Sequence, residues 1–471
     1  MIYELLRWGV VLAAVAASVG SAGHALLWKR DPRAALGWIV VSLTVPVAGP
    51  LLYFVFGINR IRTKAQRLPI ARRGRQDEDR PAGSREELPR EFSELAGIAG
   101  AVSLFKLAAG NSVEVLHNGE QAFPAMLQAI DEATSHVFLS SYIFESNRSG
   151  LDFVDALARA TERGVDTRVL VDGVGERYSR PRVSRILARR GVAVARFLPP
   201  RLVPPMLHIN LRNHRKILVV DGKVAFTGGM NIGDRHLAAR TDNPDRVVDA
   251  HFRLRGPVVG QLQRVFLDGW AFVAGQDVER FPADDSEAGS AMCRTIVEGP
   301  DEDLDKLLSV LVAAVSAARE QVAIMTPYFV PPRELVGALK GAALRGVRVT
   351  VIVPDRNNLP FVHWASRKMM WELLQRGVRI YLQPPPFVHT KLLMVDRHYV
   401  QVGSANMDPR SLRLNFELVV EIYDRDFAAT IDDHFRAVRD RSHEITLEEV
   451  DSRPLPTRIL DSLAWLMTPY L

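Results

Sequence analysis

Two long apolar segments lie near the N-terminus. The first, from Trp8 to Trp28, contains no Asp, Glu, Lys or Arg in 21 residues, and as a helix it would span about 30 Å of hydrocarbon. The second, 26 uncharged residues from Ala34 to Asn59, contains Pro46 and Pro50, which favour a kinked or re-entrant helix. Because one apolar segment directly follows the other, a cleaved signal peptide is disfavoured. The pattern predicts a transmembrane helical hairpin.

The rest of the chain shows the same order of apolar and polar segments twice. The runs at His136–Phe144 and Gln321–Phe329 are typical of buried strands that end in aromatic residues. Each is followed by a helical stretch and then by Arg-Gly-Val, at Arg163 and Arg345, which opens another apolar strand. Strand, helix, glycine and strand form the pattern of βαβ units. We therefore expect an α/β protein with two similar domains, each a mixed sheet flanked by helices, related by pseudo-two-fold symmetry.

These patterns divide the chain into four parts. We expect a two-helix membrane anchor at residues 1–60, a basic juxtamembrane segment and linker at 61–104, a first α/β domain at 105–290 and a second at 291–471.

The charge is concentrated in one place. The chain has 60 Lys and Arg against 54 Asp and Glu, a net charge of +6, but seven basic and no acidic residues lie between Arg60 and Arg75. The remainder is therefore close to neutral, which argues against a nucleic-acid-binding domain and for contact with an anionic membrane. By the positive-inside rule, both termini face the cytoplasm. The single cysteine, Cys293, excludes a disulfide framework and a cysteine-rich zinc site.

Each α/β repeat carries the same polar string, H-x-K-x4-D-x6-G-[GS]-x-N, with the two histidines 175 residues apart. One copy consists of His214, Lys216, Asp221, Gly229 and Asn231, and the other of His389, Lys391, Asp396, Ser404 and Asn406. A lone H-x-K on a strand is usually structural, whereas a match repeated in register indicates function. Six histidines without a repeated partner are left out of the predicted site: His208, His236, His251, His363, His398 and His434.

The spacing of the string has a structural meaning. Residues two apart on a strand project from the same face, so each histidine is expected beside its lysine. The apolar run after the lysine predicts a buried strand, and the asparagine would return beside the pair from the neighbouring strand. Asp221 and Asp396 come five residues after the histidines, which places them on the opposite face, where we expect them to support the backbone.

Two such sets around one point would suit a phosphodiester. The lysines and asparagines can hold its oxygens, one imidazole can attack phosphorus, and the other can protonate the departing alkoxide. No metal or other cofactor is predicted, because the lysines supply the positive charge and no cluster with metal-ligand spacing occurs.

The two strings resemble the paired HKD motifs of the phospholipase D superfamily, and several shorter strings resemble its bacterial cardiolipin synthase branch. These include Ser141-Tyr-Ile-Phe144, Asp172-Gly-Val-Gly175, Asn213-His-Arg-Lys-Ile217, Pro327-Tyr-Phe329 and Asn415-Phe-Glu417. The resemblance implies transfer of a phosphatidyl group from one phosphatidylglycerol to another through a phosphatidyl-histidine, giving cardiolipin and glycerol. It also implies a bacterial inner-membrane protein with multiple passes and cytoplasmic catalytic domains.

The resemblance further implies individual roles. His214, in the first motif, would be the nucleophile and His389 the general acid and then the base. Superfamily members place a carboxylate 25–35 residues after each motif histidine; here Asp249 follows His214 by 35 residues and Glu417 follows His389 by 28. Which carboxylate serves which histidine stays open.

Four alternative functions share these features. A phospholipase D that uses water, yielding phosphatidic acid, or a transphosphatidylase with a different acceptor would use the same intermediate, and the motifs do not distinguish them. A nuclease is disfavoured by the anchor and by the neutral α/β part. An inactive lipid-binding scaffold is disfavoured because both motifs are intact. The sequence leaves the oligomeric state open.

Overall fold

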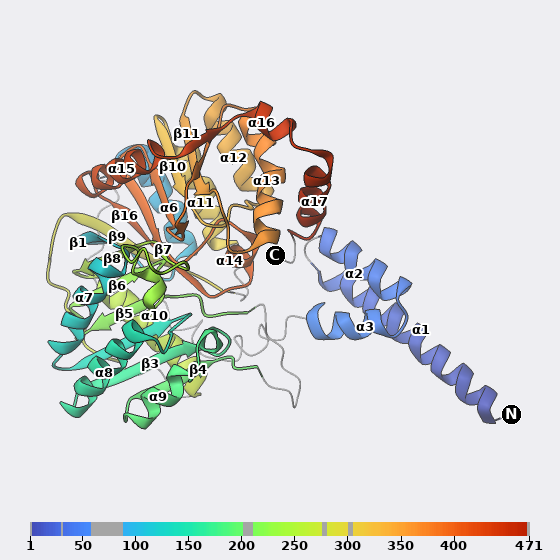
Figure 1. Cartoon of the computed structure of the whole chain (residues 1–471), viewed down its shortest axis with the longest axis horizontal. Helices are drawn as coiled ribbons and strands as arrows, with labels where there is room; N and C mark the ends of the chain where they lie inside the picture. Colours follow the sequence, from blue (N-terminus) through green and yellow to red (C-terminus); the bar gives the residue numbers. More distant parts are fainter. Residues whose placement is uncertain are drawn as a thin grey trace. The chain divides into compact units, whose positions relative to one another are not determined.

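The computed structural model describes residues 2–29, 32–57, 88–200, 211–275, 280–299 and 305–468 (Figure 1). The chain divides into two compact units: Met1–Arg67 with Pro200–Leu207, and Leu68–Pro199 with His208–Leu471. The basic run from Arg60 to Arg75 lies outside the described residues.

The first unit is built from apolar helices. Helix α1, Ile2–Trp28, is the one described helix that is long and apolar enough to cross a membrane. The second apolar segment is broken near Pro46 into α2, Pro32–Thr44, and α3, Ala48–Leu52, followed by a π-helical turn, η1, Tyr53–Gly57. The break therefore falls where the prolines predicted a kink, and neither piece alone spans a bilayer.

The second unit is organised around one large mixed sheet. Within the described residues, fifteen strands join in the order β17-β12-β11-β10-β14-β15-β16-β9-β1-β8-β6-β5-β2-β3-β4. The strands of the first half are β1 Ala108–His117, β2 His136–Ser141, β3 Asp166–Asp172, β4 Ala193–Phe197, β5 Ile217–Val220, β6 Val224–Gly228 and β8 Ala250–Arg255. Those of the second half are β9 Ala291–Glu298, β10 Gln321–Met325, β11 Arg348–Pro354, β12 Arg379–Gln383, β14 Leu392–Val395, β15 Tyr399–Gly403, β16 Glu417–Tyr423 and β17 His443–Ile445.

The strand order shows the predicted pseudo-symmetry. Read outward from the antiparallel pair β1 and β9, the first half follows β8, β6, β5, β2, β3, β4 and the second follows the equivalent β16, β15, β14, β10, β11, β12. The outer strands of each half pair in parallel: β2 with β3 and β3 with β4 in the first half, and β10 with β11 and β11 with β12 in the second. The strands nearer the centre pair antiparallel. The two halves therefore share a continuous sheet rather than a loose interface.

Helices cover both faces of this sheet (Figure 1). One face is covered by α10 Val258–Ala274 and α15 Arg425–Arg439, whose apolar residues join one core with strands from both halves. The other face is covered in the first half by α7 Asn118–Asp131, α8 Arg148–Glu162 and α9 Val183–Arg189. In the second half it is covered by α6 Arg90–Val102, α11 Lys306–Ala317, α12 Arg333–Leu344 and α13 Pro360–Leu374.

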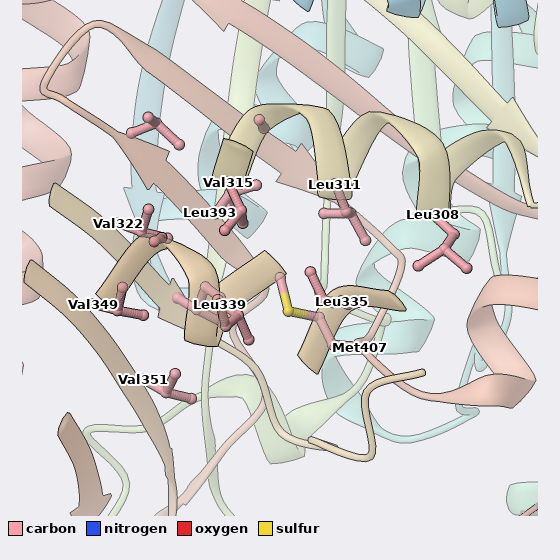
Figure 2. Close-up of a cluster of buried hydrophobic side chains, with 14 of the residues drawn as sticks. Leu308, Leu311, Val315, Val322, Leu335, Leu339, Val349, Val351, Leu393 and Met407 are labelled. Atoms are coloured by element: carbon pink, nitrogen blue, oxygen red, sulfur yellow. The ribbon is translucent and has the colours of Figure 1, made fainter. Parts of the chain in front are cut away.

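The core of the second half shows why these segments fold as predicted. Leu308, Leu311 and Val315 from α11 and Leu335 and Leu339 from α12 interdigitate above strand residues such as Val322, Val349 and Val351 (Figure 2). Helical spacing of three to four residues and strand spacing of two residues each present one apolar face to this layer. The short helices α14 Pro409–Arg413, α16 Leu447–Asp451 and α17 Leu455–Leu466, and the turns η4 Gly175–Tyr178 and η5 Asp234–His236, complete the unit.

Candidate active site

Both motif histidines lie in extended segments that lead into a central strand. His214 precedes β5 and His389 precedes β14, so each histidine comes just before the buried apolar strand that its motif predicted. Each segment is also joined by backbone hydrogen bonds to the opposite half. His214 N donates to the carbonyl of Phe416 at 2.9 Å, and His389 N donates to the carbonyl of Val248 at 2.8 Å. The second contact extends a short parallel pair, β7 Val247–Val248 with β13 Phe387–Val388.

These cross-connections decide which carboxylate meets which imidazole. Glu417 Oε2 lies 3.0 Å from Nδ1 of His214, and Asp249 Oδ2 lies 2.9 Å from Nδ1 of His389. Each histidine is therefore held by the carboxylate that follows the other motif. With Nδ1–H donating to a carboxylate, the ring is fixed as one tautomer and Nε2 is left for chemistry.

Burial sets the protonation of both rings. His214 and His389 are each 8% exposed, and burial, reinforced by the motif lysines, lowers the pKa of His214 to about 4 and that of His389 to about 3. Burial alone would raise the pKa of Asp249, but the hydrogen bond and charge of His389 hold it at about 2. The pKa of Glu417 is lowered by His214 in the same way, against the effect of burial. Both imidazoles are thus neutral, and both carboxylates ionised, in the free enzyme near pH 7.

The two lysines are as buried as the histidines. Lys216 Nζ donates to the His214 carbonyl at 2.7 Å, and Lys391 Nζ donates to the His389 carbonyl at 2.6 Å. Burial lowers the pKa of Lys216 to about 7 and that of Lys391 to about 8. Lys391 also lowers the pKa of His214, and Lys216 lowers that of His389, so the charges of both halves act on both rings. The structure thus brings the two predicted sets together in one cluster.

The motif aspartates point away from this cluster. Asp221 accepts hydrogen bonds from the backbone amides of Thr134, Ser135 and His136 at 2.7–2.9 Å, at the start of β2. Asp396 accepts the equivalent amides at the start of β10, from residues 319–321, at 2.7–2.8 Å. Both aspartates therefore tie the turn after their own strand to the neighbouring strand, in the backbone role expected from their spacing.

Replacing Asp221 with alanine is expected to affect stability and not chemistry. The substitution leaves three backbone amides without their acceptor, which should lower the free energy of unfolding by about 1–3 kcal/mol. Denaturant unfolding of the detergent-solubilised protein measures this loss, while turnover per folded molecule should stay unchanged. The exposed Asp155→Ala, which removes a surface pair with Arg190, is the control. A folded Asp221→Ala protein without activity would contradict this role.

Ser404 and Gly229 occupy equivalent positions but serve their carboxylates differently. Ser404 Oγ donates to Glu417 Oε2 at 2.5 Å and so orients the partner of His214. At Gly229 an added Cβ would lie 2.6 Å from Asp249 Oδ1, so glycine leaves room for the other carboxylate. The amide of Ala250 donates to the same oxygen at 2.9 Å.

The two asparagines follow β6 and β15, the neighbours of the strands that begin after the motif lysines. Asn231 Oδ1 accepts the amide of Ile143 at 3.1 Å, and Asn406 Nδ2 donates to Ser411 Oγ at 3.1 Å. Both are buried, at 6% and 4% exposure; Asn231 holds the segment after β2, and Asn406 holds helix α14.

Two tyrosines and two histidines that the sequence did not assign to the site lie beside it. The rings of Tyr142 and His214 lie 5.0 Å apart, those of Tyr328 and His389 lie 6.5 Å apart, and Lys216 Nζ lies 5.4 Å from the Tyr142 ring centre. An aromatic residue just after the first strand of each repeat was the available signal. His236 and His251 are buried and lie close enough to Asp249 for its charge to raise their pKa, although burial lowers both overall. They had no repeated partner in the sequence.

Within the described residues, no three His, Cys, Asp or Glu side chains converge in a way that could hold a metal ion.

A duplicated mixed sheet with a His–Lys pair from each half in one cluster defines the phospholipase D-like fold. The crystal structure of phosphatidylserine synthase from Haemophilus influenzae Rd KW20 has this fold, with a TM-score of 0.63 and 16% identity over 80% of this chain and all of that one. The family described as "Cardiolipin synthase, PLD-like domain" matches residues 126–270 and 311–439, and "Phospholipase D-nuclease N-terminal" matches residues 16–57.

Similarity extends along nearly the whole chain. The major cardiolipin synthase ClsA of Bacillus subtilis (strain 168) is 32% identical over 469 residues, covering 94% of this chain and 95% of that protein. A cardiolipin synthase of Halalkalibacterium halodurans is 31% identical over 460 residues, covering 94% of this chain and 90% of that protein. This chain belongs to the cardiolipin synthase family of phospholipase D-like enzymes, which confirms the resemblance seen in its paired motifs.

Proposed function

We propose that this enzyme makes cardiolipin from two molecules of phosphatidylglycerol and releases glycerol. The observation that carries the proposal is the crossed site: two neutral imidazoles, each held at Nδ1 by a carboxylate, share one buried cluster with two lysines. Such a cluster can bind one phosphodiester between two rings with opposite roles. The family and the cardiolipin synthase relatives support this choice of lipids.

The first step forms a covalent intermediate. Nε2 of His214 attacks phosphorus of the donor, and the bond from phosphorus to the glycerol headgroup breaks. The anionic diester raises the pKa of His389, which takes up a proton from water as the donor binds. His389 then gives this proton to the departing alkoxide, so glycerol leaves. Lys216 and Lys391 stabilise the charge that develops on the phosphoryl oxygens.

The second step reverses these roles. His389, now neutral, takes the proton from the terminal hydroxyl of a second phosphatidylglycerol, and that oxygen attacks phosphorus. The bond to His214 Nε2 breaks and cardiolipin is released. His389 then loses its proton to water, so both rings are neutral again.

The lysines predict an alkaline limit on activity. A lysine loses its positive charge as the pH rises through its pKa, and the pKa values of Lys216 and Lys391 are lowered by burial to about 7 and about 8. We therefore expect kcat/KM, which reports groups of the free enzyme, to fall as the pH rises above this range. A pH profile of phosphatidyl transfer measures the fall. Constant kcat/KM up to about pH 10, where an ordinary lysine titrates, would contradict it.

We also propose that the N-terminal unit inserts into the bacterial inner membrane as a multi-pass anchor, with both termini and the catalytic unit in the cytoplasm. The length and apolar surface of α1 support insertion, and the basic run after residue 59 supports this orientation. A C-terminal tag should resist protease in intact spheroplasts and become sensitive after lysis.

One assay tests the reaction. Purified, detergent-solubilised full-length protein is incubated with phosphatidylglycerol labelled in the headgroup, and lipids and water-soluble products are separated. Labelled cardiolipin with free glycerol in equal amounts supports the proposal. Phosphatidic acid as the only lipid product would show a hydrolase instead.

A further inference from the structure

A buried arginine beside the active site has unused hydrogen-bonding capacity. Arg212 is 2% exposed, and its Nε and Nη2 atoms have no hydrogen-bond partner among the described residues. A buried guanidinium without partners is costly, since its charge and its N–H groups have lost water. Such a group in a native protein is satisfied by a water, an ion or a ligand.

Asp172 accounts for only part of this charge. It approaches through one contact, from Arg212 Nη1 to Asp172 Oδ1 at 3.4 Å. The same carboxylate already accepts the amides of Val174, Gly175 and Asn213 at 2.9–3.0 Å. Asp172 therefore holds the loop after β3 and positions the guanidinium, but it leaves the Nε–Nη2 edge unused.

The backbone directs Arg212 to the same side as His214. Asn213 between them forms a parallel bridge with Phe416, and the residues on either side of a bridged residue project from the same face, about 7 Å apart along the strand. Tyr142 lies near both residues. Its ring packs against that of His214, and its hydroxyl is close enough to Arg212 for the charge of the arginine to act on it.

The opposite half has no equivalent cation. The position that corresponds to Arg212, 175 residues further along, is Phe387, whose ring centre lies 6.1 Å from that of His389. The chain therefore has an arginine at this position in one half and a phenylalanine at the equivalent position in the other. Two lipids that enter in turn would meet different surroundings.

We propose that Arg212 binds the phosphate of the acceptor lipid. This inference rests on the proposed function, because the acceptor is then a phosphatidylglycerol with a phosphate of its own, one glycerol away from the attacking hydroxyl. The lysine cluster serves the reacting phosphorus, and the Nε–Nη2 edge of Arg212 offers two parallel donors that match two phosphate oxygens. A neutral acceptor such as free glycerol does not need this contact.

The test compares two acceptors on one enzyme. Full-length wild-type protein and Arg212→Gln are assayed for cardiolipin formation, and separately for exchange of labelled glycerol into phosphatidylglycerol, which uses the same donor and intermediate. Cardiolipin formation should fall about 100-fold in the variant, as expected for two lost charged hydrogen bonds. Glycerol exchange should stay within about threefold of wild type.

Two further variants guard against a structural explanation. Arg212→Lys keeps the positive charge but lacks the two parallel N–H donors of the guanidinium. It should lose cardiolipin formation selectively even if the glutamine variant folds poorly. Arg294→Gln removes a buried arginine that pairs with Glu421, and should lower both reactions by the same factor through the folded fraction. Equal losses in both reactions for the Arg212 variants, or no loss in either, would overturn the role in acceptor binding. A wild-type protein that shows neither cardiolipin nor exchange would instead overturn the proposed function.

Discussion

Replacing His214 with alanine should lower phosphatidyl transfer by about 10⁴-fold or more, because the group proposed to form the covalent intermediate is then missing. The loss should be the same with phosphatidylglycerol and with a phosphatidyl ester of nitrophenol. A good leaving group does not replace the atom that attacks phosphorus. Product formation and intact-protein mass measure turnover and the phosphatidyl-enzyme.

His389→Ala should behave differently with the two substrates. It should be inactive with phosphatidylglycerol, whose glycerol must be protonated on departure, but it should release nitrophenol in a burst, because nitrophenolate leaves without a proton. The phosphatidyl-enzyme should then accumulate, since the base for the second step is missing. His443→Ala, at an exposed histidine paired with Glu449, is the control. A burst from His214→Ala and none from His389→Ala would exchange the two roles.

The crossed pairing can be tested by comparing Glu417→Gln and Asp249→Asn with the same two substrates, phosphatidylglycerol and the nitrophenol ester. Each change removes the acceptor that fixes one imidazole, and losses of about 10²–10⁴-fold in kcat are expected. Glu417→Gln should impair both substrates, because it disturbs His214. Asp249→Asn should impair phosphatidylglycerol but spare the nitrophenol burst, because it disturbs His389.

The reverse pattern would mean that each carboxylate serves the histidine of its own motif. Glu444→Gln is a suitable control, since this glutamate pairs with Arg379 at the edge of the sheet. Thermal unfolding in detergent checks that each variant remains folded.

The repeated elements could be predicted because their patterns are long. The strand predicted at the start of each repeat appears as β2 and β10, and the helical stretches that follow appear as α8 and α12. Asp221 lies in the turn after β5 and bonds to the backbone as expected, but neither it nor His214 is part of the strand on which the parity argument was based.

The crossing of the carboxylates could not be predicted in this way. It depends on the bridge between Asn213 and Phe416 and on β7 and β13, which have two residues each. Segments this short carry no periodicity, and sequence spacing gives distance along the chain rather than proximity across the sheet. The burial of Arg212 could not be predicted for a related reason. Arginine is usually exposed, and nothing in the sequence distinguishes this one as buried.

The difference between Arg212 and Phe387 bears on why a duplicated chain is useful. A symmetric dimer of single repeats could also bring two imidazoles together, each hydrogen-bonded to a carboxylate of the other subunit. Both sides of the site would then have the same sequence. When the two copies are fused in one chain, residues on each side of the site can change independently. Gly229 opposite Ser404 and Asp249 opposite Glu417 are further positions where the copies have diverged. An enzyme that must tell its first lipid from its second gains from such independence.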